Sequence, residues 1–123
     1  MEDTYECSNV LLDKTLKFAV RIVKLEVYLK NQKNEYAISK QVLRSATSIG
    51  ANAHEAVYGI SRSDFNSKMQ ISLKETAETE YWIKLLLQSG YINEKEGKSL
   101  LDDCIEIKKI LISTLNTSKQ HND

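Results

Sequence analysis

The sequence predicts an all-α fold: an antiparallel up-down-up-down four-helix bundle that is oligomeric. The first observation is that 123 residues contain no proline and only four glycines. Such a composition suits long helices, whereas sandwiches and barrels need many glycine and proline turns. The second observation is that four long segments repeat apolar residues every three or four positions. We therefore expect one domain over residues 1–123, with its core over about residues 10–117 and polar termini.

The first predicted helix covers Val10–Asn31. Its inner seam steps by four and three residues, as in a heptad repeat: Leu11, Thr15, Phe18, Ile22, Leu25 and Leu29. A second apolar set widens the arc well beyond one seam: Leu16, Ala19, Val20, Val23 and Val27. The polar segment Asn31–Glu35 is typical of a connection to the next helix.

The second predicted helix covers Ala37–Tyr58 and is rich in small residues, which let a neighbouring backbone approach closely. Its apolar stripe is Ile38, Val42, Ala46, Ile49, Ala53 and Ala56. A polar strip runs beside that stripe, at about 100° per residue: Arg44, Ser48, Asn52 and Glu55. Polar groups next to a core need partners if they are buried. We expect the strip to be mainly structural, with Asn52 and Glu55 serving a helix–helix or subunit contact.

Two further helices follow, each opened by a capping pattern. Ser61 with Asp64 starts a helix over Arg62–Ser89, and Asn93 with Glu96 opens one over Glu94–Thr117. The predicted inner row of the third helix is Phe65, Met69, Leu73, Ala77 and Ile83, beside a second row of Ile71, Trp82, Leu85 and Leu86. The predicted stripe of the fourth is Leu100, Cys104, Ile107 and Leu111. Short connections make sequential helices antiparallel neighbours.

The apolar arcs are wider than a single bundle core needs, and extra apolar surface in a soluble protein usually marks an interface. The pattern therefore favours a homo-oligomer, with the chain itself as its first partner. The alternative is that short helices simply wrap a large core.

Charge is balanced overall but not locally. The chain has 17 basic and 17 acidic residues, which excludes a strongly basic nucleic-acid binder. Residues 8–33, however, carry six basic against two acidic side chains, including a line of Lys14, Lys17, Arg21 and Lys24. If RNA or a ribonucleoprotein binds, we expect phosphate contacts from this line, supported by Arg44 and Arg62. The acidic tail Glu2, Asp3 and Glu6 would then fold over the line and mask it. The alternative is an ordinary solvated face.

No catalytic, cofactor or metal site is predicted, so we do not expect an enzyme. The two histidines, His54 and His121, lack metal-ligand spacing. Glu75 and Glu78 are not followed by the histidines that di-iron bundles use. Cys7 and Cys104 are far apart and are expected to be reduced thiols of a cytoplasmic protein. The N-terminus does not resemble a signal peptide, and no apolar run is long enough for a membrane span.

Two segments together resemble a known family. The first supplies Gln41, Arg44, Ser48, Ile49, Asn52 and Glu55, followed by Arg62, Ser63, Asp64 and Phe65. The second supplies Ile71, Leu73, Glu75, Glu78, Trp82 and Leu85, and then Gly90 and Tyr91. This combination is similar to the signature of the proteins encoded in intervening sequences of bacterial 23S rRNA genes. The resemblance covers about Leu11–Leu115. It departs at Leu43, where the family often has a second arginine, and at Ala53, His54 and Ala56.

The resemblance implies a left-handed antiparallel four-helix bundle that assembles as a homopentamer, with no enzymatic activity and a poorly defined role. A related branch implies an accessory role in diversity-generating retroelements, in which a basic pentamer binds a reverse transcriptase and nucleic acid. The zero net charge makes that branch the weaker match. A purely structural or protein-interaction module is the alternative to RNA binding.

Overall fold

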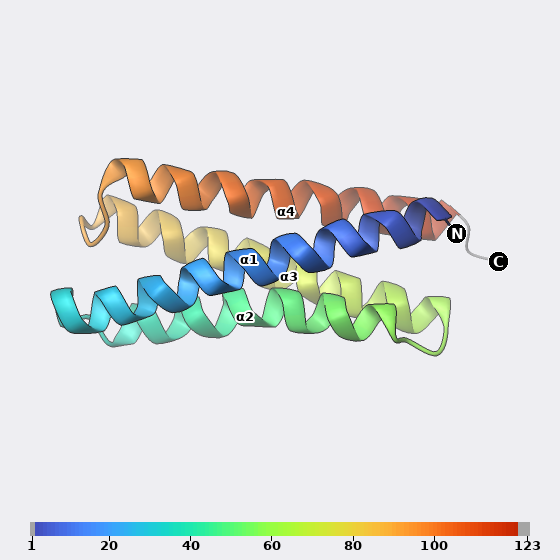
Figure 1. The fold of residues 1–123 in the computed structure, drawn as a ribbon, viewed down its shortest axis with the longest axis horizontal. Helices are drawn as coiled ribbons and strands as arrows, with labels where there is room; N and C mark the ends of the chain where they lie inside the picture. The colour runs from blue at the N-terminus through green and yellow to red at the C-terminus, as the bar shows by residue number, and fades with distance from the viewer. Residues whose placement is uncertain (1, 121–123) are drawn as a thin grey trace.

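A computed structural model describes the backbone of residues 2–120 and the side chains of residues 9–120. It contains four helices: α1 (Glu2–Lys33), α2 (Ala37–Val57), α3 (Arg62–Gln88) and α4 (Glu94–Gln120). Figure 1 shows them side by side, with the first and third turns at one end of the molecule and the second at the other. Each helix packs against the one before and after it in the chain, and α1 also packs against α4.

Helix α1 is longer than the sequence pattern predicted. It begins at Glu2 and ends at Lys33, so the connection to α2 is only residues 34–36. Residues 2–9 lack apolar periodicity, but acidic residues in a first helical turn suit the positive end of the helix dipole. The expected tail therefore continues the helix, and it does not fold back over the basic line. The side chains of Glu2, Asp3 and Glu6 lie outside the described residues.

Side-chain caps hold the starts of α2, α3 and α4. Ser61 accepts a hydrogen bond from the Asp64 amide at 3.0 Å, and Asn93 accepts one from the Glu96 amide at 2.7 Å, as predicted. The start of α2 at Ala37 was predicted correctly, and Glu35 lies in the connection as expected, but its role as a cap was not predicted. Its carboxylate is buried and accepts from three successive backbone amides, the closest at 2.7 Å. A negative charge at this position also interacts favourably with the partial positive charge at the N-terminus of α2.

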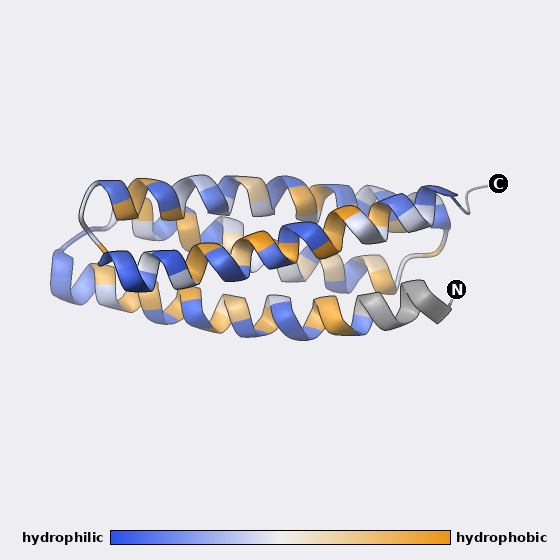
Figure 2. Cartoon of the chain, turned by 90° about the horizontal axis from the view of Figure 1, so that it is seen from above, coloured by the Kyte–Doolittle hydropathy of each residue, from blue (hydrophilic) through white to orange (hydrophobic). Residues whose placement is uncertain are grey.

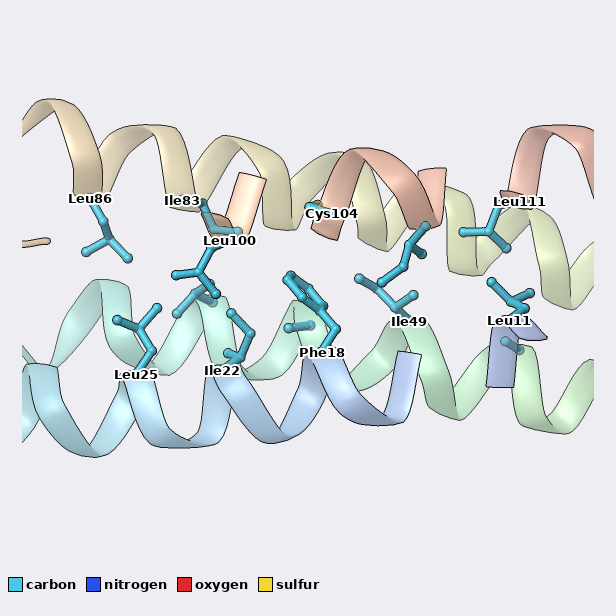
Figure 3. Close-up of a cluster of buried hydrophobic side chains, with 14 of the residues drawn as sticks. Leu11, Phe18, Ile22, Leu25, Ile49, Ile83, Leu86, Leu100, Cys104 and Leu111 are labelled. Carbon is cyan, nitrogen blue, oxygen red and sulfur yellow. The ribbon is translucent and has the colours of Figure 1, made fainter. Parts of the chain in front are cut away.

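The core runs the length of the bundle, with side chains from all four helices interleaved along its axis (Figure 3). All six residues of the predicted inner seam of α1 are buried, as are the four of the predicted stripe of α4. Helix α3 differs from its predicted row, because Ala77 is exposed and Phe65 and Leu73 are only partly buried. The buried face of α3 consists instead of Met69, Ser72, Thr76, Thr79, Ile83 and Leu86.

Buried hydroxyl groups line the contact between α2 and α3. Ser72 Oγ donates to the Ile49 carbonyl of α2 at 2.7 Å, and Thr79 Oγ1 lies 2.8 Å from Ser45 Oγ. Thr76 Oγ1 donates to the Ser72 carbonyl within α3. Serine and threonine are short enough to satisfy their hydroxyls on nearby carbonyls, so a hydroxyl-rich face can pack as tightly as an apolar one. We call this contact the hydroxyl seam.

Two glycines mark close approaches between helices. A methyl group at Gly50 would lie 3.1 Å from Thr15 Oγ1 of α1, and one at Gly97 would lie 2.6 Å from Leu87 Cδ1 of α3. Gly90 has a φ of +83°, which favours glycine and ends α3.

Candidate functional site

Acidic side chains of α4 face the predicted basic line on α1. Lys14 Nζ lies 3.0 Å from Glu106 Oε1. Arg21 forms two ion pairs, with Asp103 at 2.7 Å and with Glu96 at 3.2 Å. Half of the basic line therefore bridges two helices, and its charge is compensated within the chain.

Within residues 9–120, the other two residues of the line form no ion pair with the acids of α4. Among the residues whose side chains are described, Lys17 pairs with Asp13, one turn earlier on the same helix, at 3.0 Å. Lys24 is exposed and makes no ion pair within residues 9–120. Lys17 and Lys24 are thus the two positive charges of the line that remain accessible to a partner.

Arg44 lies on a different surface, between α2 and α3. Its guanidinium contacts the carboxylates of Glu75, at 3.4 Å, and Glu78, and it also donates to Gln41 Oε1 at 3.3 Å. The indole Nε1 of Trp82 donates to the same Glu78 carboxylate at 2.9 Å. Side chains from both resemblance segments therefore meet in one cluster, in which one arginine serves two carboxylates.

The rest of the polar strip continues along the same edge of α2. Asn52 is half-buried and donates to the Ser48 carbonyl of its own helix at 2.8 Å. Glu55 is exposed and pairs with Lys68 of α3 at 3.2 Å. The strip thus follows the rim of the α2–α3 contact.

Arg62 occupies a third location. It donates to the carbonyl oxygen and to Oγ of Ser118, both at 3.3 Å, and Ser118 in turn donates to Asn66 Oδ1. These contacts tie the start of α3 to the end of α4. The six candidate nucleic-acid residues are therefore distributed over three helix contacts and do not form one cluster.

A continuous apolar row on α1 is exposed. Leu16 is 66% exposed, and three valines at positions 20, 23 and 27 are each between 46 and 48% exposed. At about 100° per residue this row lies opposite the buried seam, so α1 is apolar on two opposite faces. Figure 2 shows hydrophobic residues recurring along α1, whose first turns are grey. We call these four residues the outer row.

The sequence analysis did not predict a cluster of ion pairs between α3 and α4, centred on the largely buried carboxylate of Glu80. Glu80 lies 2.9 Å from Lys84 and 2.7 Å from Lys108, and hydrogen bonds from Lys108 and then Lys84 lower the pKa of the Glu80 carboxyl. The Glu80–Lys84 pair is visible as an i, i+4 spacing, whereas Lys108 is brought in only by the fold. Burial raises the pKa of the nearby Cys104 thiol to about 12, which makes it a poor nucleophile.

The described residues contain no group of three or more histidine, cysteine or acidic side chains that could hold a metal ion. His54 is exposed, and its ring packs against Tyr58 with centroids 5.2 Å apart. Within the part of the chain that the structure describes, no helix is both long and apolar enough to span a membrane.

Comparisons with known proteins agree with the fold. The family model described as 23S rRNA-intervening sequence protein matches residues 8–113. A crystal structure of a protein of unknown function from the S23 ribosomal protein family of Bacteroides thetaiotaomicron is 50% identical. The alignment covers 89% of this chain and 98% of that one, with a TM-score of 0.88. No curated protein matches the sequence. The chain belongs to the 23S rRNA-intervening sequence protein family.

Proposed function

We propose that the protein is a self-assembling helical module whose copies associate through the outer row of α1. The observation that supports this most is the position of the row. Four consecutive seam positions, Leu16, Val20, Val23 and Val27, are apolar and exposed on the face opposite the core. Isolated exposed apolar residues are ordinary, but a contiguous row with seam spacing is the pattern that packs against another helix.

The energetics require more than this row. Burying an exposed valine or leucine fully yields about 1.5–3 kcal/mol, and these four are only about half exposed. The row would therefore contribute on the order of 4 kcal/mol, near the lower limit of the estimated cost of association. The surface of the neighbouring copy that covers the row must therefore contribute further apolar and charged contacts for the assembly to be stable.

The family resemblance favours five copies. A pentamer would have five times the 14.0 kDa mass of one chain. Light scattering coupled to size-exclusion chromatography gives this mass directly.

The test is a charge placed in the row. Leu16→Glu should shift the protein to monomer, because a buried unpaired carboxylate opposes association. Ala51→Glu is the matched control, because Ala51 is exposed on α2 and away from the row. Both variants should keep the helical circular dichroism of the wild type. If Leu16→Glu associates as the wild type does, the row is not the contact and the proposal fails.

RNA binding is the second candidate, supported by the exposed charges of Lys17 and Lys24. In an oligomer each copy would repeat this pair, so weak phosphate contacts would add up. Affinity should fall steeply with salt and depend little on RNA sequence. Fluorescence anisotropy with a structured and a single-stranded RNA should show that Lys17→Glu combined with Lys24→Glu abolishes binding. Deletion of residues 1–7 should tighten binding, because it removes three acidic side chains and no basic one. The absence of a saturable signal from both the intact and the truncated chain would exclude this candidate and leave assembly alone.

A further inference from the structure

We propose that the outward face of α3 binds an unpaired strand of nucleic acid, with a base stacked on Tyr81 and phosphates held by Lys74 and Lys84. In the described part of the chain, α1 packs against α2 and α4 and not against α3. The outward face of α3 is therefore separate from the outer row and from the lysines of α1. The proposed site requires neither self-assembly nor RNA binding by α1.

One strip of α3 is exposed along most of the helix. Its members recur every three or four positions and fall within an arc of about 80°, opposite the buried face of α3. We call it the α3 strip: Gln70, Lys74, Ala77, Tyr81, Lys84 and Gln88. The strip is about 27 Å long and none of its members is acidic. The outer row of α1 is apolar, whereas the α3 strip presents positive charges, amides and an aromatic ring.

On the side of the strip toward α4, positive charge exceeds negative charge. The Glu80 carboxylate lies 2.9 Å from Lys84 and 2.7 Å from Lys108 of α4. One carboxylate thus serves two ammonium groups, and this cluster keeps one positive charge. Lys84 is also exposed, so its ammonium group can contact a phosphate while it stays near Glu80.

On the side toward α2, two acids share one cation. Glu75 and Glu78 both contact the guanidinium of Arg44. The remaining negative charge is offset by Lys74, which is exposed and forms no ion pair within residues 9–120. With both sides counted, four cations and three carboxylates leave the surface around the strip with one net positive charge. Such a surface favours phosphates, although weakly.

The aromatic ring of the strip lies between its two lysines. Tyr81 is 59% exposed, and along the helix axis it lies about 10 Å from Lys74 and about 5 Å from Lys84. Its ring meets that of Trp82 at 69°, with centroids 5.1 Å apart. The indole of Trp82 is itself anchored by its hydrogen bond to Glu78 at 2.9 Å. Tyr81 therefore packs beside an anchored neighbour, and exposed aromatic rings of this kind are platforms on which bases stack.

The spacing fits a single strand better than a duplex. Lys74 and Lys84 are about 15 Å apart along the helix, and a stacked strand places one phosphate about every 3.4 Å. The two lysines would thus hold phosphates no more than about four nucleotides apart, with the base on Tyr81 between them. A duplex keeps its bases stacked on each other, so it could contact the lysines but not the ring.

The only tryptophan of the chain provides a direct readout, because Trp82 lies beside Tyr81. A short oligouridylate or oligothymidylate should quench its fluorescence saturably at low salt. A hairpin duplex and tripolyphosphate, which offer phosphates without an unpaired base, should not. For two phosphate contacts, the logarithm of the affinity should fall with the logarithm of the salt concentration with a slope of about −1.4.

Variants of exposed residues separate stacking from charge, with the anisotropy of a labelled oligouridylate as readout. Tyr81→Ala should weaken binding roughly fivefold or more, whereas Tyr81→Phe keeps the ring and should bind like the wild type. Tyr58→Ala is the matched control, because Tyr58 is 75% exposed at the turn between α2 and α3. Lys74→Gln combined with Lys84→Gln should make the affinity nearly independent of salt.

Two variants of α1 separate this site from RNA binding by α1. Lys17→Gln combined with Lys24→Gln should leave the quenching of Trp82 unchanged. Strand binding that leaves Trp82 fluorescence unchanged and is lost in this α1 double variant would overturn the inference, while RNA binding by α1 stands. Quenching by the duplex as strong as by the strands, or an unchanged affinity in Tyr81→Ala, would also overturn the inference. No saturable binding of either strand would overturn both.

Discussion

The α2–α3 contact and the α1–α4 contact hold their polar groups in opposite ways. Between α2 and α3, serine and threonine hydroxyls are fully buried and hydrogen-bonded across the helices, as in the 2.7 Å bond from Ser72 to the Ile49 carbonyl. Between α1 and α4, the polar contacts are ion pairs at the surface, such as Arg21 with Asp103. The first arrangement requires close packing, whereas the second tolerates rearrangement.

This difference bears on where function lies. Surface ion pairs contribute little to stability, typically about 0–1 kcal/mol, whereas a buried contact between small residues loses more when its shape changes. The residues that carry the family resemblance on α2 lie at the tightly packed contact. The outer row and the accessible Lys17 and Lys24 lie on α1. The contact that holds the fold most tightly and the surface proposed for association thus lie on different helices.

The largest expected effect comes from enlarging a side chain in the α2–α3 half of the core. Ala46 is fully buried on α2, and Ala46→Leu should destabilise the protein by about 2–3 kcal/mol through overpacking. Ala51→Leu on the exposed side of the same helix should change stability by no more than about 0.5 kcal/mol. Urea unfolding at one fixed protein concentration measures both. Equal effects would mean that the contact is not tightly packed.

A smaller effect is expected from the hydroxyl seam. Thr79→Val and Ser45→Ala each remove one side of the 2.8 Å hydroxyl contact. Each should cost about 1 kcal/mol, since one buried hydrogen bond has about that net value. The double variant should cost less than the sum, because the two hydroxyls are direct partners. Strict additivity in the double-mutant cycle would show that the hydroxyls act independently.

The α1–α4 ion pairs should contribute less and depend on salt. Arg21→Gln removes pairs with Asp103 and Glu96, and its side chain is 30% exposed, so the expected loss is about 0.5–1 kcal/mol at low salt. In high salt the difference from the wild type should shrink, because exposed charges are screened. Unfolding curves at two ionic strengths measure this. A loss that high salt leaves unchanged would contradict a surface role for this pair.

The smallest effect is expected from Glu55. Its exposed pair with Lys68 should contribute no more than about 0.5 kcal/mol, so Glu55→Ala should melt within a few degrees of the wild type. Asn52→Ala should behave similarly, because its amide donates only to its own helix. Thermal melts followed by circular dichroism measure the melting temperatures of both variants and of the wild type. A large loss for Glu55→Ala would place the polar strip in a buried contact, such as one between subunits.

Periodicity was sufficient to predict most of the fold. The inner seam of α1 and the stripe of α4 are buried because their spacing keeps apolar side chains on one face. The face of α3 could not be predicted this way, since Ser72, Thr76 and Thr79 count as polar in any pattern until their acceptors are known. The cap formed by Glu35 was missed because its three amide donors belong to the next helix.

The candidate site was less predictable because charge pairing between helices depends on tertiary structure. The basic line was visible in the sequence, but nothing local indicates that Lys14 and Arg21 meet acids about 80–90 positions later while Lys24 does not. The excess apolar surface on α1 was predicted from its width. Only the fold identifies Leu16, Val20, Val23 and Val27 as its exposed part.

Sedimentation velocity of the wild-type protein at micromolar concentration tests the central proposal, self-assembly through α1, most directly. The proposal predicts a single species several times heavier than the 14.0 kDa chain, and dissociation of that species by Leu16→Glu. A wild-type protein that sediments as a monomer of 14.0 kDa at every micromolar concentration measured would contradict the proposal.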